Sequence, residues 1–492
     1  MSALPTSIHS VAQVRAIDRY AIETLGIPGY TLMLRAAEAA FNSLRSEWPK
    51  VSQIVVVCGY GNNAGDGYVL ARLALAARIQ LTLIAVGEPA QLSGDARRAW
   101  QDFVATGGVT QHWEAGSLNA ADVVIDAIFG TGLSRPLDAT LQSYVQAINH
   151  CGRPIFSLDV PSGLDADSGA VLGAAIEAHR TISFGGLKQG FYLGEGPNYV
   201  GKLLFDDLDI PEDVARQVGC VAQRLDSQIV KDALPRRQRT THKGQQGHVL
   251  MVGGGLGMPG AVRLAGEACL RVGAGTVTVA TRAEHVAAFV AGRPELMCLG
   301  VASAAELAPL IANAHVIALG PGLGVDTWAR TLFDAVLASD KPLIIDADAL
   351  NLLAQQPIAR GNWVLTPHPG EAARLLGSNT LAIQATRMQA ANDLAQRYGG
   401  TIVLKGAGTL VWNAAQCPAL CDRGNPGMAA PGMGDVLTGI IAGIAAQCGE
   451  LSLAARVGVY VHAVAGDMAA RHGERGLLAS DLFAYLPTCV NP

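Results

Sequence analysis

The segment with the clearest chemical potential is Gly432-Met-Gly-Asp435, which stands between a turn-rich stretch and an apolar run typical of a helix. Glycines at the start of such a helix would leave backbone N–H groups free, and these groups together with the helix dipole favour an anion. Asp435 would then lie beside that anion, where a carboxylate can take a proton from a hydroxyl while the N–H groups bind a phosphate. Taken alone, the tetrapeptide is equally consistent with a plain turn followed by an N-terminal acid.

A second glycine-rich turn, Lys405-Gly-Ala-Gly-Thr409, follows the apolar run 401–404, which predicts a strand. Two such turns in one half of the chain favour a nucleotide site over two unrelated turns. The pair resembles the ribokinase-like superfamily of small-molecule kinases, in which a Gly-x-Gly-Asp motif supplies an anion hole and a catalytic base. The resemblance implies that Asp435 is the base.

The first half of the chain repeats short apolar runs that end in polar residues. The run 54–58 predicts a parallel strand buried on both faces, and it passes through the glycine-rich stretch 59–67 into a helix expected over 68–78. Similar runs predict further strands over 81–86, 122–126, 155–159 and 181–184. Ligands bind beyond the carboxyl ends of parallel strands. We therefore expect the polar residues that follow these strands to gather there, namely Asn63, Asp66, Asp126, Asp159 and Ser162.

Three carboxylates with amide and hydroxyl oxygens can bind a hard cation and still leave an acid–base group. Any single Asp after a strand is equally well explained as a helix N-cap. The presence of the whole set favours a ligand site.

Three segments, residues 62–67, 126–132 and 159–163, resemble the NAD(P)H-hydrate epimerase family, whose fold is Rossmann-like. That family interconverts the R and S forms of hydrated NADH and NADPH, damaged cofactors that carry a hydroxyl on the nicotinamide ring. The resemblance implies acid–base work by Asp159, with Asp66 as second choice, and a potassium ion bound by Asn63, Asp126 and Ser162. It implies a substrate-lining set made of Asn62, Asn63, Ala64, Gly65, Asp66, Gly130, Thr131, Gly132, Leu133, Ser134, Arg135, Pro136 and Asp159.

Two positions depart from the epimerase pattern. Ala64 replaces the glycine usual in Asn-Asn-Gly-Gly-Asp, and Tyr60 replaces the proline of Gly-Pro-Gly. The extra methyl of Ala64 is compatible with function unless that position needs a positive φ. Lys188, which follows the predicted strand 181–184, is equally consistent with a phosphate contact and with a solvated side chain.

A polar, basic segment over 212–245 separates the first half from a second series of strand–turn–helix units. We expect a boundary within 213–225 and two domains, 1–215 and 222–492. In the second half, Gly255-x-Gly257-x-x-Gly260 fits a dinucleotide fingerprint. The next predicted strand, however, ends in Thr281-Arg282 without the acid that would bind a ribose, which favours a ligand-facing turn of another α/β fold.

Five segments of the second half, 320–324, 346–351, 366–371, 405–409 and 432–435, together resemble the ADP-dependent NAD(P)H-hydrate dehydratases, which are ribokinase-like. The two resemblances cover almost the whole chain and match the family of bifunctional repair enzymes that fuse both activities. They imply adenine-nucleotide contacts from Lys405, Gly406, Ala407, Gly408, Thr409 and Gly434. They imply hydrated-cofactor contacts from Ala261, Gly322, His368 and Asp435. Pro431 stands where a small residue is usual and removes one backbone donor, which leaves the anion hole to residues 432–434.

The resemblance implies that ADP and magnesium serve dehydration of the S hydrate, with AMP and phosphate as products. Two other classes of protein remain open from the residues alone: a ribokinase-like small-molecule kinase with a regulatory Rossmann domain, and a non-catalytic nucleotide sensor. The Asn, Asp and Ser set of the first half argues against the kinase, and Asp435 argues against the sensor. His368, between two prolines, is also consistent with a purely structural role.

Length and composition limit the possible fold classes. A chain of 492 residues that is 50% hydrophobic, with 57 glycines clustered after apolar runs, predicts two three-layer α/β domains. The first would be a Rossmann-like parallel sheet and the second a ribokinase-like domain. The apolar stretch after Asp435 is broken by glycines and polar residues, so we expect a buried helix and no membrane span.

Charge and cysteine content indicate which partners and which cellular compartment are expected. The net charge is −5 with no dominant basic tract, which argues against nucleic acid as a partner. Nine scattered cysteines and the lack of a visible secretory signal predict reduced thiols in the cytoplasm. Cys417 and Cys421 lack the second pair that a zinc site would need. The expected partners are hydrated NADH, hydrated NADPH and ADP, with no membrane partner and a homo-oligomeric assembly.

Overall fold

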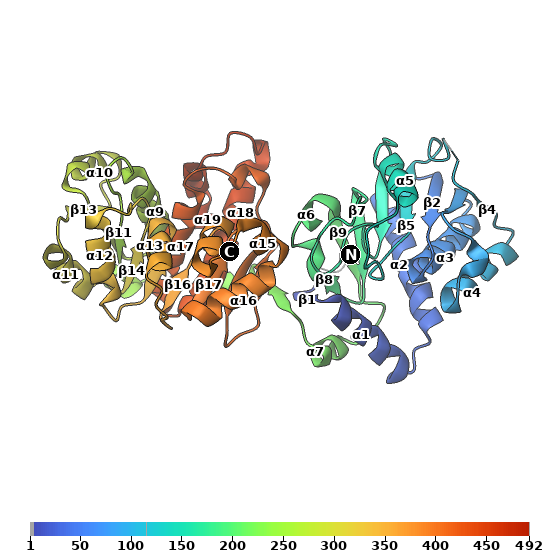
Figure 1. Ribbon diagram of the computed structural model, residues 1–492, viewed down its shortest axis with the longest axis horizontal. Helices are drawn as coiled ribbons and strands as arrows, with labels where there is room; N and C mark the ends of the chain where they lie inside the picture. Colours follow the sequence, from blue (N-terminus) through green and yellow to red (C-terminus); the bar gives the residue numbers. More distant parts are fainter. Residues whose placement is uncertain (1–3, 115, 492) are drawn as a thin grey trace. The chain divides into compact units, whose positions relative to one another are not determined.

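The computed structural model describes residues 4–114 and 116–491, and the chain divides into two compact units, Met1–Ala222 and Gln223–Pro492 (Figure 1). Each unit has its own sheet with helices packed against it. The predicted α/β class is confirmed for both units. The functional extents 1–215 and 222–492 stay predictions.

Seven strands form the sheet of the first unit in the order β4-β3-β2-β5-β6-β7-β9, and every neighbouring pair is parallel. Their bounds are β2 (Gln53–Cys58), β3 (Gln80–Ala85), β4 (Thr110–Gln111), β5 (Val123–Ala127), β6 (Ile155–Leu158), β7 (Arg180–Phe184) and β9 (Lys202–Asp206). Two short strands, β1 (Ser7–His9) and β8 (Leu187–Lys188), also pair in parallel. The strand order reverses between β2 and β5. Their carboxyl ends therefore form the switch point where open α/β sheets bind ligands.

The first unit has three layers because residues of β2 point alternately to the two faces of the sheet. Ile54, Val56 and Cys58 join the core shared with α1 (Val11–Glu23), α2 (Gly29–Glu47), α3 (Asn62–Ala76) and α4 (Gly94–Ala105). Val55 and Val57 join the core on the other face, with α5 (Ala139–Asn149). The remaining helices of the unit are α6 (Gly196–Tyr199) and α7 (Glu212–Val218). The predicted strand buried on both faces is thereby confirmed.

The sheet of the second unit runs in the order β13-β12-β11-β14-β15-β16-β17-β18-β19, followed by Gln223 and Arg224 of β10 (Ala222–Arg224). The strands are β11 (His248–Val252), β12 (Thr276–Thr281), β13 (Met297–Gly300), β14 (Val316–Leu319), β15 (Leu343–Ile345), β16 (Trp363–Leu365), β17 (Thr401–Leu404), β18 (Thr409–Asn413) and β19 (Ala419–Cys421). Pairing is parallel from β13 to β17, whereas β18 is antiparallel to both of its neighbours.

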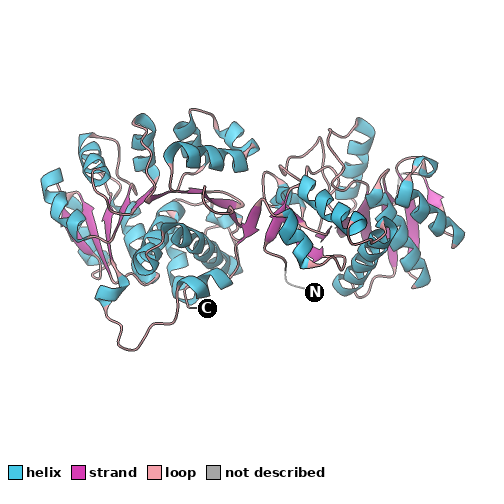
Figure 2. Cartoon of the chain, turned by 90° about the horizontal axis from the view of Figure 1, so that it is seen from below, coloured by secondary structure: helices cyan, strands magenta, loops and turns pink. Residues whose placement is uncertain are grey.

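Helices lie on both sides of this second sheet (Figure 2). One core contains inward residues of the central strands, such as Val249 and Met251, together with α9 (Pro259–Arg271), α17 (Met433–Cys448) and α18 (Leu451–Ala469). A Cβ at Gly439 would lie 2.0 Å from the carbonyl oxygen of Ala265, so this glycine permits the close approach of α17 to α9. The other helices are α8 (Gln228–Ala233), α10 (Val286–Gly292), α11 (Ala304–Asn313), α12 (Thr327–Leu337), α13 (Ala347–Gln355), α14 (Pro369–Leu376), α15 (Thr380–Ala385), α16 (Arg387–Tyr398) and α19 (Leu486–Cys489).

Two local features differ from the sequence-based expectations. The helix expected from residue 68 begins at Asn62, and the glycine-rich stretch forms its first turns. Gly65 and Gly67 lie so close to Met33 and Ala127 that a Cβ would stand 2.5 and 2.7 Å from them, so the stretch is needed for packing as well as for a turn. The antiparallel strands β18 and β19 were not predicted. The buried helix expected after Gly434 is confirmed as α17.

Within residues 4–114 and 116–491, every helix is too short or too polar to cross a lipid bilayer.

Candidate functional sites

The candidate site of the first unit lies at the carboxyl ends of β2, β5 and β6. The structure places the predicted polar residues on three elements, namely the first turns of α3 (Asn62, Asn63, Asp66), β5 (Asp126) and the turn after β6 (Asp159, Ser162). Gly61 is the N-cap of α3 and has no side chain with which to cap the first N–H groups. The switch point of the sheet thus collects the residues as the strand pattern predicted.

Asp126 is the centre of a buried hydrogen-bond network. Its carboxylate accepts bonds from the Ser157 hydroxyl at 2.8 Å, from the Ser162 hydroxyl at 2.6 Å and from the Ser162 backbone N–H at 2.9 Å. Burial raises the pKa of Asp126, although these hydrogen bonds oppose the rise. Ser157 was not predicted, since its place on the buried strand β6 suggests packing alone.

Asp159 forms a buried ion pair with Lys188. The Nζ of Lys188 donates to Oδ1 of Asp159 at 2.6 Å, and the lysine side chain is fully buried. The backbone N–H of Thr131 donates to the other carboxylate oxygen at 3.2 Å. Asp159 also has φ of 64°, a strained conformation of the kind that clusters at functional sites. Of the two interpretations left open for Lys188, the solvated side chain is excluded, because the side chain is enclosed and its charge is matched by Asp159.

Three further titratable groups surround this ion pair. Burial raises the pKa of Asp18, on α1, to about 6, with Lys188 opposing and Asp159 adding to the rise. Burial, then the carboxylates of Asp159 and Asp18, raise the pKa of Asp66 well above its usual value. His9 is aligned with Lys188 by the pairing of β1 with β8, and burial followed by the lysine charge lowers its pKa to about 4. His9 and Asp18 were missed, because neither carries a local signal in the sequence.

The side chain of Asn63 fits a role as a cation ligand. It is buried, and within the described residues neither of its amide atoms has a hydrogen-bond partner. A buried polar group without a partner is costly unless a ligand completes it. Potassium takes oxygen ligands, and the Asn63 carbonyl with the Asp126 and Ser162 oxygens offers such a set.

Only part of the loop 130–136, which follows β5 and is predicted to line the substrate, lies close to Asp159. A Cβ at Gly130 would lie 2.6 Å from a carboxylate oxygen of Asp159, so the loop touches that residue closely. The outer part of the loop is exposed at Gly132, Ser134, Arg135 and Pro136, whereas Leu133 packs against the core. Ala64 is buried without a positive φ, so its extra methyl is accommodated.

The candidate site of the second unit begins at the N-terminus of α17. Gly432 is its N-cap with φ of 86°, which favours glycine. The Met433 N–H donates to the Ala430 carbonyl, whereas in the described part of the chain the N–H groups of Gly434 and Asp435 have no protein acceptor. Pro431 is exposed and precedes the cap, so its missing N–H leaves these two donors intact.

A charged network faces this helix N-terminus. The Nζ of Lys405 donates to Oδ1 of Asp346 at 2.8 Å, and the Thr438 hydroxyl donates to Oδ2 of the same carboxylate at 2.7 Å. Glu371 Oε2 lies 3.8 Å from Lys405 Nζ. Burial alone lowers the pKa of Lys405, but the carboxylates of Asp346 and Glu371 outweigh it and raise that pKa. A Cβ at Gly434 would lie 3.2 Å from Lys405 Nζ, so the lysine faces the free N–H groups.

Asp435 is the candidate proton acceptor of this network. Burial, followed by repulsion from the Asp346 carboxylate, raises its pKa to about 7, with Lys405 opposing the rise. Such a pKa suits a general base near neutral pH. The side chain lies in the first turn of α17 beside the unpaired N–H groups, as the sequence predicted.

Hydrogen bonds from Arg387 fix the turn 405–409, and this residue was not predicted from the sequence. The buried guanidinium donates to the carbonyl oxygens of Leu404, Lys405 and Gly408 at 3.1–3.3 Å. Burial lowers the pKa of Arg387 to about 10. A lone arginine at the start of a helix carries no signal that it will be buried under a distant turn.

His368 has a structural role that its sequence context left open. Its Nδ1 accepts the N–H of Gly370 at 3.0 Å and of Glu371 at 3.4 Å, so it caps α14. Burial, then the charge of Lys405, lowers its pKa and keeps the ring neutral. Half of the side chain remains exposed, which leaves room for a ligand contact.

Ala261, in the first turn of α9, lies close to Gly322, in the turn after β14. A Cβ at Gly322 would stand 3.1 Å from the Cβ of Ala261, and the Gly322 carbonyl accepts the N–H of Gly255. The Gly324 N–H donates to Asp348, whose charge acts on Asp435. The second site therefore extends from α9 to the start of α17.

Comparison with known proteins matches both units to one kind of enzyme. A family model described as NAD(P)H-hydrate dehydratase matches residues 249–488, and one described as YjeF-related protein N-terminus matches residues 29–190. The bifunctional NAD(P)H-hydrate repair enzyme of Coxiella burnetii is 47% identical over 488 residues, covering 99% of this chain and all of that enzyme. The corresponding enzyme of Escherichia coli is 42% identical over 491 residues, covering 100% of this chain and 95% of its own length.

The chain belongs to the family of bifunctional NAD(P)H-hydrate repair enzymes. The predicted family is thereby confirmed, together with the prediction of an enzyme that combines an epimerase half and a dehydratase half. Membership in the bifunctional repair family does not fit a kinase with a regulatory domain or a nucleotide sensor.

Solved structures agree with this assignment for the second unit of the repair enzyme. A ribokinase-like superfamily protein from Enterococcus faecalis is 33% identical with a TM-score of 0.51, covering 55% of this chain and 96% of that protein. A protein of Streptococcus mutans is 31% identical with the same TM-score, covering 54% and 98%. The ribokinase-like fold predicted for the dehydratase half is confirmed.

Replacing Arg387 with Met should lower the free energy of unfolding by about 1–3 kcal/mol, because buried carbonyls of the 405–409 turn would lose their donor. Urea unfolding followed by circular dichroism measures this change. Arg397→Met, at an exposed position of the same helix, is the matched control and should change it by less than about 0.5 kcal/mol. Equal effects of the two substitutions would contradict the role assigned to Arg387.

Proposed function

We propose that this protein repairs hydrated NADH and NADPH in two steps at two sites. The first unit interconverts the R and S hydrates, and the second unit dehydrates the S hydrate with ADP, which yields AMP and phosphate. The observation that carries the dehydratase step is the arrangement at α17. There a carboxylate with a pKa of about 7 stands beside two unpaired N–H groups and a lysine.

In the dehydratase site, Asp435 takes the proton of the ring hydroxyl, and the hydroxyl oxygen attacks the terminal phosphorus of ADP. The bond between that phosphorus and the bridging oxygen breaks, and AMP leaves. The N–H groups of Gly434 and Asp435 and the ammonium of Lys405 would neutralise the transferred phosphate. The ring carbon then loses phosphate, its neighbour loses a proton, and the double bond of NADH or NADPH is restored.

The remaining residues of the resemblance have supporting positions in this scheme. The turn 405–409, braced by Arg387, would hold the adenine nucleotide through its backbone. Ala261, Gly322 and His368 would contact the hydrated cofactor. Among the described residues no cluster of three His, Cys, Asp or Glu side chains could bind a metal ion. Magnesium would enter the site with the ADP phosphates, where it would balance their charge.

In the epimerase site, inversion requires a bond at the hydroxyl-bearing carbon to break and to re-form on the opposite face. Asp159 is fixed by Lys188 and by the Thr131 N–H, so it is positioned to move the proton that accompanies this exchange. Asp66 is the second candidate, and its raised pKa makes it a proton donor. Potassium bound by Asn63, Asp126 and Ser162 would supply a fixed positive charge to the substrate oxygens.

The setting of this reaction is also proposed. The substrates and ADP are small molecules, and nine scattered cysteines suit a reducing compartment such as the cytoplasm. The mild net charge supports the proposal that no nucleic acid is bound. A homo-oligomeric assembly stays a prediction.

Substitution of each proposed acid–base group should separate the two activities. Asp435→Asn should slow recovery of NADH absorbance by about 10²–10⁴-fold, since the base is lost, while the hydrates still interconvert. Asp159→Ala should leave recovery from the S hydrate intact and abolish catalysed conversion of the R hydrate. The measurement is absorbance of NADH together with chromatography of the two hydrates. Lack of recovery from either hydrate with the unaltered protein would refute the proposed function.

The rate of dehydration should depend on pH through Asp435. Burial raises its pKa to about 7, and a base acts only when deprotonated. Therefore kcat/KM for the S hydrate should rise with pH through about 7. Asp348→Asn removes a negative charge that helps to raise this pKa, so it should move the midpoint to lower pH. A flat profile between pH 6 and 8, or a midpoint moved upward by Asp348→Asn, would contradict the assignment.

A further inference from the structure

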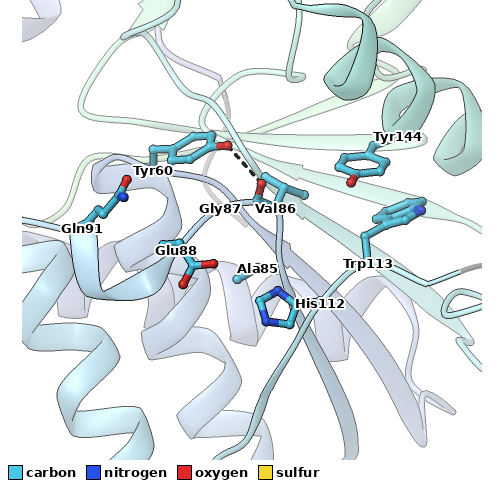
Figure 3. A pocket seen from close by; sticks show the side chains of 9 residues that line it. All are labelled: Tyr60, Ala85, Val86, Gly87, Glu88, Gln91, His112, Trp113 and Tyr144. Carbon is cyan, nitrogen blue, oxygen red and sulfur yellow. Dashed lines mark hydrogen bonds between the residues drawn. The ribbon is translucent and has the colours of Figure 1, made fainter.

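A cavity of about 340 Å³ lies beside the epimerase site, at a place that neither acid–base residue occupies. Figure 3 shows the side chains around it. Most come from the ends of three neighbouring strands: Tyr60 after β2, Val86 and Glu88 after β3, and His112 with Trp113 after β4. Tyr144 comes from α5. Its volume falls within the range of small-ligand sites, about 300–1,000 Å³.

Flat aromatic rings form one wall of this cavity. Trp113 and Tyr144 are stacked, with ring centroids 4.4 Å apart and an interplanar angle of 24° (Figure 3). The Tyr60 hydroxyl donates to the Val86 carbonyl at 3.0 Å, which fixes its ring at the opposite end. A Cβ at Gly87 would stand 2.0 Å from the Tyr60 ring, so glycine is needed for that ring position. Rings held in this way provide surfaces on which a planar heterocycle can stack.

A chain of contacting residues links the cavity wall at Tyr60 to the epimerase site. The Tyr60 ring packs against Phe129, with centroids 6.3 Å apart. The Phe129 N–H donates to Ser162, and the next residue along the chain, Gly130, is the one that touches Asp159. Between the two places lies the start of α3. A Cβ at Gly61 would meet no atom within 4 Å there, so there is open space beside the uncapped N-terminus of this helix.

The strand order indicates what kind of ligand could span the cavity and the epimerase site. Asp159 follows β6, on one side of the switch point between β2 and β5, and the cavity lies over β3 and β4 on the other side. Dinucleotides bind across such a switch point, with the pyrophosphate at the helix N-terminus between the two halves. A substrate whose nicotinamide ring reaches Asp159 would therefore place its other half in the cavity.

We propose that the cavity binds the adenosine half of the hydrated dinucleotide, with the purine against the Trp113–Tyr144 pair. This proposal rests on the proposed function, because it assigns the second half of the epimerase substrate. It gives Tyr60 a role as the wall shared by the cavity and the nicotinamide side. The adenosine half then adds binding energy that is the same in the ground state and the transition state, which lowers KM for the whole dinucleotide.

Glu88 sets the specificity of this subsite. It is exposed at the end of the second strand of the sheet, β3, where a carboxylate accepts a hydrogen bond from the ribose 2′-hydroxyl in dinucleotide sites. The 2′-phosphate of hydrated NADPH would face the same carboxylate and be repelled. The epimerase half should therefore prefer hydrated NADH, by about fivefold or more in kcat/KM, for charges of like sign at close range.

The test measures conversion of the R to the S hydrate by the full-length protein without ADP, so that dehydration does not contribute. Trp113→Ala should raise KM for hydrated NADH about tenfold through loss of stacking, with kcat little changed. Trp113→Phe keeps a flat ring, so its KM for hydrated NADH should stay within about threefold of that of the unaltered protein. The hydrate of reduced nicotinamide mononucleotide, which lacks the adenosine half, should be converted equally by all three proteins.

The outcomes distinguish the two proposals. No conversion of any hydrate by the unaltered protein would remove the proposed function itself. Conversion by the unaltered protein, with Trp113→Ala changing KM for the truncated hydrate as much as for the full one, would refute the adenosine subsite alone. A KM for hydrated NADH that Trp113→Ala leaves unchanged would also refute the adenosine subsite. A melting temperature equal to that of the unaltered protein shows that the variant is folded.

A second variant tests the specificity assigned to Glu88. Glu88→Gln keeps the shape of the side chain and removes its charge, so the preference for hydrated NADH over hydrated NADPH should fall towards one. The ratio of kcat/KM for the two hydrates measures this change. An unaltered protein without a preference for hydrated NADH, or a ratio that Glu88→Gln leaves unchanged, would overturn the assignment.

Discussion

A buried lysine–carboxylate pair at the carboxyl edge of a parallel sheet is the interaction on which each unit depends. Lys188 pairs with Asp159 at 2.6 Å in the first unit, and Lys405 pairs with Asp346 at 2.8 Å in the second. A lone charge would be costly in these buried places, so each partner balances the charge of the other. Around each pair the fold then gathers further carboxylates whose pKa is raised, such as Asp66 and Asp435.

The two sites differ in what surrounds the pair. The first unit places it beside an uncapped helix and an aromatic cavity, which suits a large dinucleotide without a second substrate. The second unit places it opposite two free N–H groups, which suits a transferred phosphate. In the proposed function, a buried lysine–carboxylate pair would serve proton movement in one unit and phosphate chemistry in the other.

Much of this could be predicted from the sequence, because strand ends and glycine turns are local signals. The set Asn63, Asp126 and Asp159 was found in this way. Residues that act from a distant element could not be predicted in this way. Asp18 lies on a helix with ordinary packing spacing, and Arg387 is buried only because the 405–409 turn folds over it. The role of Lys188 stayed undecided for the same reason, since its partner lies 29 residues away.

Mixing two single-site variants tests most directly the claim that the protein has two separate sites, each dependent on its own lysine. Lys188→Met should leave the dehydratase site working, and Lys405→Met should leave the epimerase site working. With pure R hydrate and ADP, each variant alone should restore NADH no faster than uncatalysed epimerisation allows, whereas an equimolar mixture should restore it at a rate near that of the unaltered protein. A mixture no faster than the single variants, although both are folded, would contradict the account.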